Sequence, residues 1–320
     1  MRRCLAMLIW LMIGAASNAS AESFTLRTTT RMLSEPLAFV FEGQGTVTAL
    51  LGAGTDPHTY QPTRKDVRSF IDADAIVFHG LYFEAQLLDL MAQLDRRKPV
   101  HSGESLQQTE DLLYAEGVED PHTWHDPVFW IETISKLADA VALDLETEVL
   151  EERTDILVAA AEQVDAWIAT QFAAIPEEQR VIVSAHDAFQ YFGQRYGITF
   201  EPLLGLSTAS ETKLARVNEL VQLVEERQIS AVFSETSVES AGITALREGA
   251  ASKGIELRSL PPLFSDALGQ EGEPGGSYFS MLLENTINMV DAMTGERPEP
   301  TPELLAFLST HNLFHSEETQ

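Results

Sequence analysis

Residues 145–174 constrain the fold more than any other stretch, because they contain neither glycine nor proline. Their apolar side chains recur at helical spacing among many Glu and Ala residues, which favour helix. We therefore predict one long helix over residues 145–175, about 40 Å in length if it is continuous. Its place midway along the chain indicates a backbone helix that joins two lobes.

Strand and helix patterns alternate on both sides of this stretch. We predict strands at residues 24–30, 46–51, 75–78, 181–183, 231–233 and 256–260, and helices starting at 63 and spanning 83–94, 128–145, 212–227, 241–253 and 278–293. The alternation is typical of an α/β fold with two lobes, residues 22–144 and 176–298, each a mainly parallel sheet flanked by helices. The Pro- and Glu-rich tail, residues 299–320, is expected to be partly disordered.

The first 21 residues have the pattern of a signal peptide. Two arginines precede an apolar run of about a dozen residues, and Ala-Ser-Ala follows at residues 19–21. That run is too short for a membrane anchor, so we expect a soluble, monomeric protein in the periplasm. The single cysteine, Cys4, lies in this segment. A metal site in the mature chain would therefore use His, Asp or Glu.

The formal net charge of -28 excludes some classes of partner. Nucleic acids and anionic membrane surfaces are bound by clusters of Lys and Arg, so neither is expected as a partner. We interpret the acidic surface as a means of keeping an exported protein soluble.

The tripeptide Asp-Pro-His occurs twice, at residues 56–58 and 120–122, and His186 follows at the same interval. Histidine is the commonest metal ligand in proteins. His186 and Asp266 each follow a predicted strand, and ligands of open α/β sheets bind outside the carboxyl ends of the strands. The pattern predicts a metal site assembled from distant loops.

The chain resembles the solute-binding proteins of bacterial zinc/manganese ABC transporters. The resemblance rests on residues 52–60, 66–67, 73–77, 120–124, 186–192, 195–197, 265–269, 276–278 and 285, in the same order. It implies two α/β lobes joined by one long helix, with one metal ion in the cleft between them. The family's four ligand positions fall on His58, His122, His186 and Asp266.

The resemblance also bears on which metal is bound. Imidazole ligands suit zinc, whereas manganese prefers more oxygen ligands. Family members that favour manganese often have a carboxylate at the position of His186, so we expect zinc, with manganese as the alternative. The zinc specialists carry a His-rich loop, which residues 104–119 lack, and a disulfide, which this chain cannot form. The chain therefore resembles the dual zinc/manganese branch.

Several neighbours of the predicted ligands are candidates for supporting roles. Glu235 is expected beside the ligands or lining the cleft, and His125 either as an auxiliary contact or, preferably, as a surface residue at the cleft mouth. Asp56, Asp120 and Asp126 could orient imidazoles, but capping of turns and helices is the preferred interpretation. We expect packing beside the site from Tyr60, Trp124, Phe189 and Tyr191, a lining role at most from His79, and surface or tail positions for His101, His311 and His315.

The favoured function is capture of a divalent metal ion and its delivery to an ABC permease with its ATPase. One alternative is a zinc hydrolase with Glu235 as general base, and another is a surface adhesin or metal buffer without a transporter. A catalytic zinc normally keeps one position open for water, whereas four protein ligands are available here. The chain also has no H-E-x-x-H or G-x-S-x-G motif, so we predict that it is not an enzyme.

Overall fold

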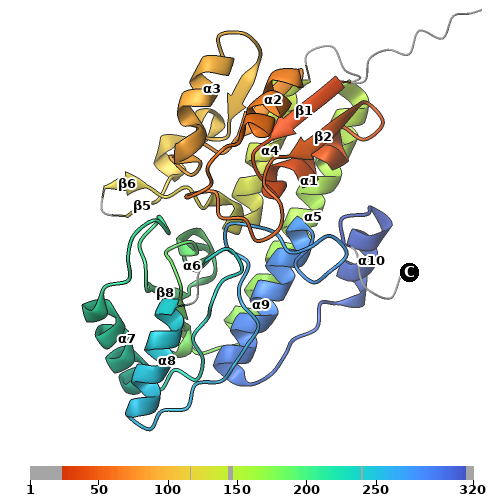
Figure 1. Cartoon of the computed structure of the whole chain (residues 1–320). Coiled ribbons are helices and arrows are strands. Elements are labelled where there is room, and N and C mark those ends of the chain that lie inside the picture. Colours follow the sequence, from red (N-terminus) through yellow and green to blue (C-terminus); the bar gives the residue numbers. More distant parts are fainter. Residues whose placement is uncertain (1–23, 116, 143–146, 239–240, 315–320) are drawn as a thin grey trace, which may run out of the picture.

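The computed structural model describes residues 24–314, apart from residues 116, 143–146 and 239–240. Figure 1 shows two lobes of helices and strands, with the helix α5 (Thr147–Ala173) running from one lobe to the other. The predicted fold class, two α/β lobes joined by one long helix, is confirmed. The predicted signal peptide lies outside the described residues, as does the predicted boundary at residue 144.

The first lobe contains a parallel sheet with the strand order β2-β1-β3-β4. Its strands are β1 (Phe24–Thr28), β2 (Gly45–Ala49), β3 (Ala75–Phe78) and β4 (Val100–Ser102). The chain passes outward from β1 to β2 on one side and from β3 to β4 on the other. The strand order thus reverses between β1 and β3, and open α/β sheets bind their ligands outside the carboxyl ends of the strands at such a point.

Helices α1 (Arg31–Val40), α2 (Arg64–Asp72), α3 (Leu88–Leu94) and α4 (Pro127–Val141) complete the first lobe. The helix predicted to start at residue 63 is α2, which Thr63 caps in a capping box with Asp66. The helix predicted over residues 83–94 was too long, because only its second half is α-helical. Leu81 and Tyr82 have left-handed φ angles of 52° and 59°, and a short 3₁₀ turn follows them before α3 begins.

Helix α1 was not among the predicted helices, and it contains a proline at its sixth position. Pro36 cannot donate the helical hydrogen bond to the carbonyl of Met32. The indole N–H of Trp130, on α4, donates to that carbonyl instead, at 3.2 Å. A side chain from another helix therefore satisfies the group that the proline leaves free.

The second lobe has a smaller sheet than predicted. Strand β7 (Val181–Ser184) pairs in parallel with β8 (Thr199–Pro202). The strands predicted at residues 231–233 and 256–260 are reduced to isolated parallel bridges, Ala231 with Arg258 and Glu235 with Leu263. Pro261 and Pro262 lie between these two bridges and have no N–H to donate, which prevents a continuous ladder there. Helices α6 (Gln190–Tyr196), α7 (Leu214–Arg227) and α8 (Ala241–Ser252) complete this part of the lobe.

One apolar core extends through both lobes. It includes buried side chains of α1 and α4, of the long helix α5, and of α9 (Tyr278–Thr294), which packs against α5. The tail also contributes to it, because α10 (Pro302–Thr310) buries Leu304 and Leu308 in the same core. The expectation of a partly disordered tail is therefore wrong for residues 302–310, where a helix capped by Thr301 packs against the body of the protein.

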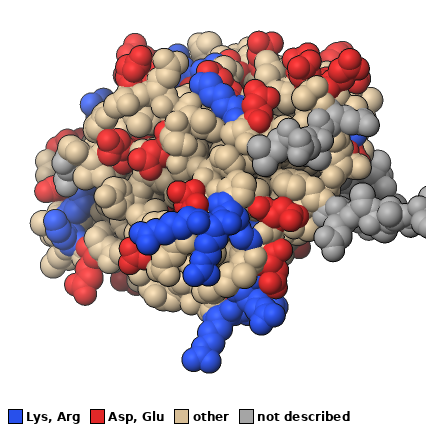
Figure 2. All heavy atoms as spheres, turned by 90° about the horizontal axis from the view of Figure 1, so that it is seen from above, with Lys and Arg blue, Asp and Glu red and all other residues tan. Residues whose placement is uncertain are grey.

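Charged side chains of both signs lie on the surface. On the face seen in Figure 2, acidic side chains are scattered in many small groups, and Lys and Arg side chains gather below the centre of the view. Within the described ranges, no helix combines the length and apolar character needed to cross a membrane.

Candidate metal centre

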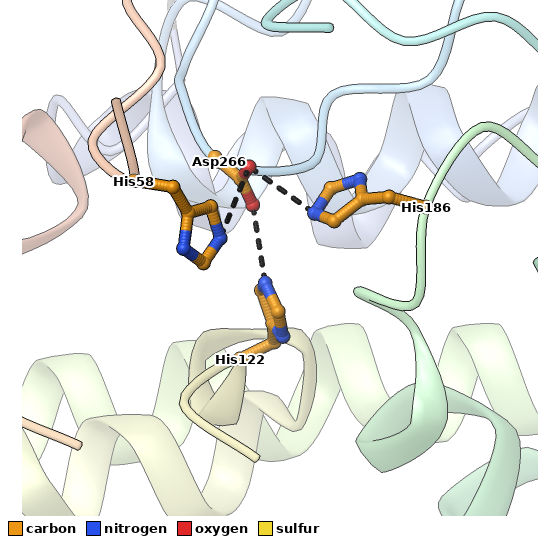
Figure 3. A group of neighbouring side chains, drawn as sticks. All are labelled: His58, His122, His186 and Asp266. Atoms are coloured by element: carbon orange, nitrogen blue, oxygen red, sulfur yellow. Dashed lines mark ion pairs between the residues drawn. The ribbon is translucent and has the colours of Figure 1, made fainter. Parts of the chain in front are cut away.

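Four polar side chains from distant parts of the chain converge between the lobes. They are His58, His122, His186 and Asp266, and one potential ligand atom of each lies within 4.8 Å of all the others. Figure 3 shows the three imidazoles arranged around the carboxylate of Asp266. His58 is 6% exposed and the other three are at most 1% exposed. The structure thus brings together the four residues that the sequence analysis selected.

His58 lies in the loop that leads from β2 to α2. Asp56 fixes this turn, because its carboxylate accepts from the backbone N–H of His58 at 2.9 Å and from the hydroxyl of Thr59. The imidazole of His58 packs edge-on against the ring of Phe83, with 4.9 Å between ring centroids. The capping interpretation of Asp56 is confirmed, and Phe83 is a neighbour that the sequence analysis did not identify.

His122 precedes the short 3₁₀ helix Thr123–His125. The Oδ1 atom of Asp120 accepts both from the backbone N–H of His122, at 2.9 Å, and from its ring Nδ1, at 2.7 Å. The ring is therefore held with Nε2 facing the centre. The preferred interpretation of Asp120 as a capping residue was incomplete, because this carboxylate both shapes the turn and orients the imidazole.

His186 follows β7, and its ring is oriented by a carboxylate in the same way. Glu235 accepts from the backbone N–H groups of Ala185 and His186, at 2.8 and 3.0 Å, and from the ring Nδ1 of His186. Glu235 is 4% exposed. Its expected place beside a ligand is what the structure shows.

The carboxylate of Asp266 faces all three imidazoles. Its oxygens lie 3.7 Å from Nε2 of His58, 3.4 Å from Nε2 of His122 and 3.2 Å from Nε2 of His186. Both oxygens and all three Nε2 atoms are buried without a hydrogen-bond partner among the described residues. Buried polar atoms are rarely left unpaired, so five of them around one point fit the binding of a cation.

The electrostatics of the cluster are those of a site built for positive charge. Burial alone would raise the pKa of Asp266, but the charge of His186 and the nearby imidazoles of His122 and His58 hold that pKa well below its usual range. Burial lowers the pKa of His58 to about 3. Burial also opposes protonation of His122, but Asp120 and Asp266 outweigh it and raise the pKa of His122 to about 9. Because metal binding requires neutral imidazoles, a metal ion that binds here would displace any proton on Nε2 of His122 and His186.

Other predicted residues lie close by without facing the centre. His125 is fully buried, with its ring 4.5 Å from that of Phe189, so the preferred expectation of a surface position is wrong. The 3₁₀ turn that follows His122 directs it inward, against the second lobe. His79 is buried too, but its Nε2 hydrogen-bonds with the hydroxyl of Thr30 at 2.7 Å and its ring stacks on Trp130.

The remaining histidines and Asp126 have other environments. Asp126 caps α4 and pairs with Arg195, as the capping interpretation predicted. His101 is partly buried on β4, and His311 packs against Phe307. His315 lies outside the described residues.

The four aromatic residues expected around the site have different positions. Trp124 is buried 5.2 Å from the ring of His122, and Phe189 covers His125. The hydroxyl of Tyr191 donates to the carbonyl of Asp120 at 3.2 Å and so joins the lobes near the site. Tyr60 is partly exposed, and its hydroxyl donates to Asp66 at the start of α2.

Comparison with known proteins agrees with this architecture. The family model described as the periplasmic component A of a zinc-uptake complex matches residues 27–292. The manganese-binding lipoprotein MntA of Bacillus subtilis is 31% identical over 283 residues, which is 87% of this chain and 92% of that protein. The zinc-binding protein TroA of Treponema pallidum is 30% identical over 269 residues, 83% of this chain and 87% of that protein.

The solved structure of the periplasmic zinc-binding protein TroA superposes with a TM-score of 0.82 at 29% identity, covering 85% of this chain and 99% of that chain. The fold and these relatives define the class as that of two-lobed solute-binding proteins. The chain belongs to the family of periplasmic zinc-uptake components.

Proposed function

We propose that this protein captures one divalent metal ion, preferably zinc, outside the cytoplasm and delivers it to an ABC permease for import. The ligands of the ion are His58, His122, His186 and Asp266. The observation that carries the proposal is the set of buried, unpaired nitrogen and oxygen atoms that face one another at the centre. Membership of the zinc-uptake family supports the transport role.

The preference for zinc follows from the donor set. Three neutral imidazoles and one carboxylate suit zinc, whereas manganese is better matched by a site richer in oxygen. The relatives do not decide between the metals, because their names include a zinc-binding, a manganese-binding and an iron-transport protein. Zinc as the main cargo and manganese as a second cargo is therefore our proposal.

Glu235 supports a binding protein over a hydrolase. A general base needs a carboxylate oxygen that is free to take a proton from water. In this structure Oε1 of Glu235 accepts from two backbone N–H groups and Oε2 contacts Nδ1 of His186. Because both oxygens are engaged, Glu235 orients a ligand and is not placed to activate water.

The test is metal analysis of the purified protein, followed by competitive titration with zinc and manganese at neutral pH. We expect one tightly held equivalent of zinc, and a loss of affinity of about a hundredfold or more in His58→Ala and in Asp266→Ala, because each variant removes a protein ligand. His311→Ala and Asp155→Ala are matched controls. His311 directly follows α10 and Asp155 lies in α5, both away from the centre.

Unchanged zinc affinity in both ligand variants would contradict the assigned site. Tight manganese binding that zinc does not displace would contradict the metal preference while leaving the site intact. For the transport role, we expect deletion of the gene to reduce zinc uptake by cells in zinc-poor medium, with recovery when the wild-type protein is restored.

A further inference from the structure

Arg31 is the first residue of α1 and reaches from the first lobe to the segment that carries Asp266. Its Nη1 donates to the carbonyl of Gly269 at 2.5 Å, and its Nη2 donates to the carbonyl of Gly276 at 2.6 Å. The two N–H groups of one planar guanidinium thus bind two carbonyls that stand seven positions apart in the sequence. Arg31 is not one of the four residues of the metal cluster.

The segment between those carbonyls is a compact loop closed by hydrogen bonds of its own backbone. The N–H of Gly269 donates to the carbonyl of Gly275 at 2.8 Å, which closes the loop at its base. Gly275 has a φ of +71°, and a Cβ atom there would lie 2.3 Å from the ring of Phe264. Because Arg31 binds both ends of this closed loop, it fixes the loop as one body against α1.

Asp266 enters this body directly, since only Ala267 and Leu268 separate it from Gly269, and both are buried. The first lobe also binds the chain just before Asp266, where the indole N–H of Trp124 donates to the carbonyl of Ser265 at 2.8 Å. Asp266 is therefore held on both sides by side chains of the first lobe, from Trp124 before it and from Arg31 after it.

Glu35 adds a second contact one turn further along α1. Its carboxylate accepts from the backbone N–H of Tyr278, the first residue of α9. Arg31 and Glu35 thus bind consecutive parts of the same connection, the loop and the start of the helix that follows it. We call this connection, residues 265–278, the aspartate segment.

We infer that Arg31 is a positioning residue for Asp266. Arg31 holds the aspartate segment against the first lobe and thereby limits the rate at which the closed site releases its metal ion. This inference rests on the proposed metal-binding function. Asp266 is the one anionic ligand of the four and faces imidazoles from both lobes, so a small displacement of its carboxylate changes all three contacts. A lysine could bind only one of the two carbonyls well, because its ammonium group is a point donor without the planar fork.

The experiment measures zinc release from the full mature protein into an excess of chelator. We expect Arg31→Ala to release zinc about tenfold faster than wild type, and Arg31→Lys to lie between the two. Arg247→Ala is the matched control, because Arg247 also donates to two backbone carbonyls, those of Val232 and Arg258, but within the second lobe. This control should release zinc at the wild-type rate.

A double-mutant cycle shows whether Arg31 acts through Asp266. In Asp266→Asn, which retains the shape of the side chain, adding Arg31→Ala should change the equilibrium affinity for zinc by less than about twofold. Melting temperatures without metal show whether each variant folds; if Arg31→Ala does not, Arg31→Lys carries the test.

Wild-type release from Arg31→Ala, or equally fast release from Arg247→Ala, would overturn the inference while the proposed function stood. A loss of zinc affinity well above about twofold when Arg31→Ala is added to Asp266→Asn would overturn it as well. A wild-type protein that binds no metal would instead overturn the proposed function, and the inference with it.

Discussion

Each of two proposed ligand imidazoles is paired with a carboxylate that also shapes its backbone. Asp120 binds the backbone N–H and ring Nδ1 of His122, and Glu235 does the same for His186. One acidic side chain thereby sets both the position of the residue and the rotation of its ring, so that Nε2 faces the metal site. Such partners raise the basicity of the imidazole and hold one tautomer.

We predict that Glu235→Gln lowers zinc affinity about 10- to 100-fold without removing any ligand. The amide can still accept from the backbone N–H groups, but its NH₂ group would face Nδ1 of His186 and disfavour the tautomer that leaves Nε2 free for metal. Competition with a fluorescent zinc chelator measures the change. The control is Glu201→Gln, a glutamate of the same lobe that pairs with Arg216; an equal effect in both variants would contradict a specific role for Glu235.

Among the elements, the turn after β3 packs against the proposed metal site. Phe83 of this turn packs against His58, and the neighbouring Glu84 is fully buried. The carboxylate of Glu84 accepts from the backbone N–H groups of His79 and Gly80 and from the hydroxyl of Thr29, so it closes the turn onto β1. Burial raises the pKa of Glu84 to about 7, against the effect of these hydrogen bonds.

A raised carboxyl pKa makes folding less favourable as pH rises. Below a pH of about 4.5, the pKa of Glu84 in the unfolded chain, this residue is protonated in both states, and its ionisation does not affect the free energy of unfolding. As pH rises from there to about 7, the unfolded chain ionises first, and the free energy of unfolding falls by up to about 3 kcal/mol. Glu84→Gln is neutral throughout, so it should gain stability relative to wild type between pH 5 and pH 8.

Urea unfolding of both proteins at the two pH values, with metal removed by chelator, measures this difference. Comparing the two proteins cancels the titration of the ligand histidines, which both retain. A difference in the free energy of unfolding that does not change with pH would show that Glu84 ionises normally in the folded protein.

At the scale of the whole molecule, the metal site joins the lobes. His58 and His122 come from the first lobe, and His186 and Asp266 from the second. The same boundary carries hydrogen bonds from Trp124 to Ser265 and from Thr208 to Asp56. An ion bound by both lobes therefore stabilises their contact as well as each loop.

We predict that removing the metal lowers the melting temperature of the wild-type protein by about 5 °C or more. Zinc at a hundred times its dissociation constant stabilises the folded state by about 2.7 kcal/mol, provided that the unfolded chain does not bind it. Differential scanning calorimetry with zinc and with chelator measures the shift. Asp266→Ala should show almost none; a shift as large as that of wild type would place the stabilising metal elsewhere.

Much of the fold could be predicted from local patterns. The long helix is α5, and the capping residue Thr63 and the strand β3 lie where the sequence placed them. Two of the errors occurred where distant contacts override a local rule. Pro36 lies inside α1 because Trp130 satisfies the carbonyl of Met32, and the tail forms α10 because the common core accepts Leu304 and Leu308.

The four candidate ligands could be selected from the sequence because each is a His or Asp beside a turn residue or just after a strand, and because the surrounding motifs resemble a known family. The arrangement of these four side chains in space could not be predicted from the sequence. Whether His125 faces solvent or the second lobe depends on how the lobes close, and the role of Glu235 depends on which strand ends lie side by side.

The sequence by itself determined the residue types that can bind metal, the order of the elements and the long helix between the lobes, since these follow from side-chain chemistry and from periodicity along the chain. Only the tertiary structure decided that five unpaired atoms face one point, and that Arg31 binds a loop more than two hundred positions away. The physical reason is that packing of the lobes through α5 and α9 sets those distances, and no local pattern encodes which distant groups that packing brings together.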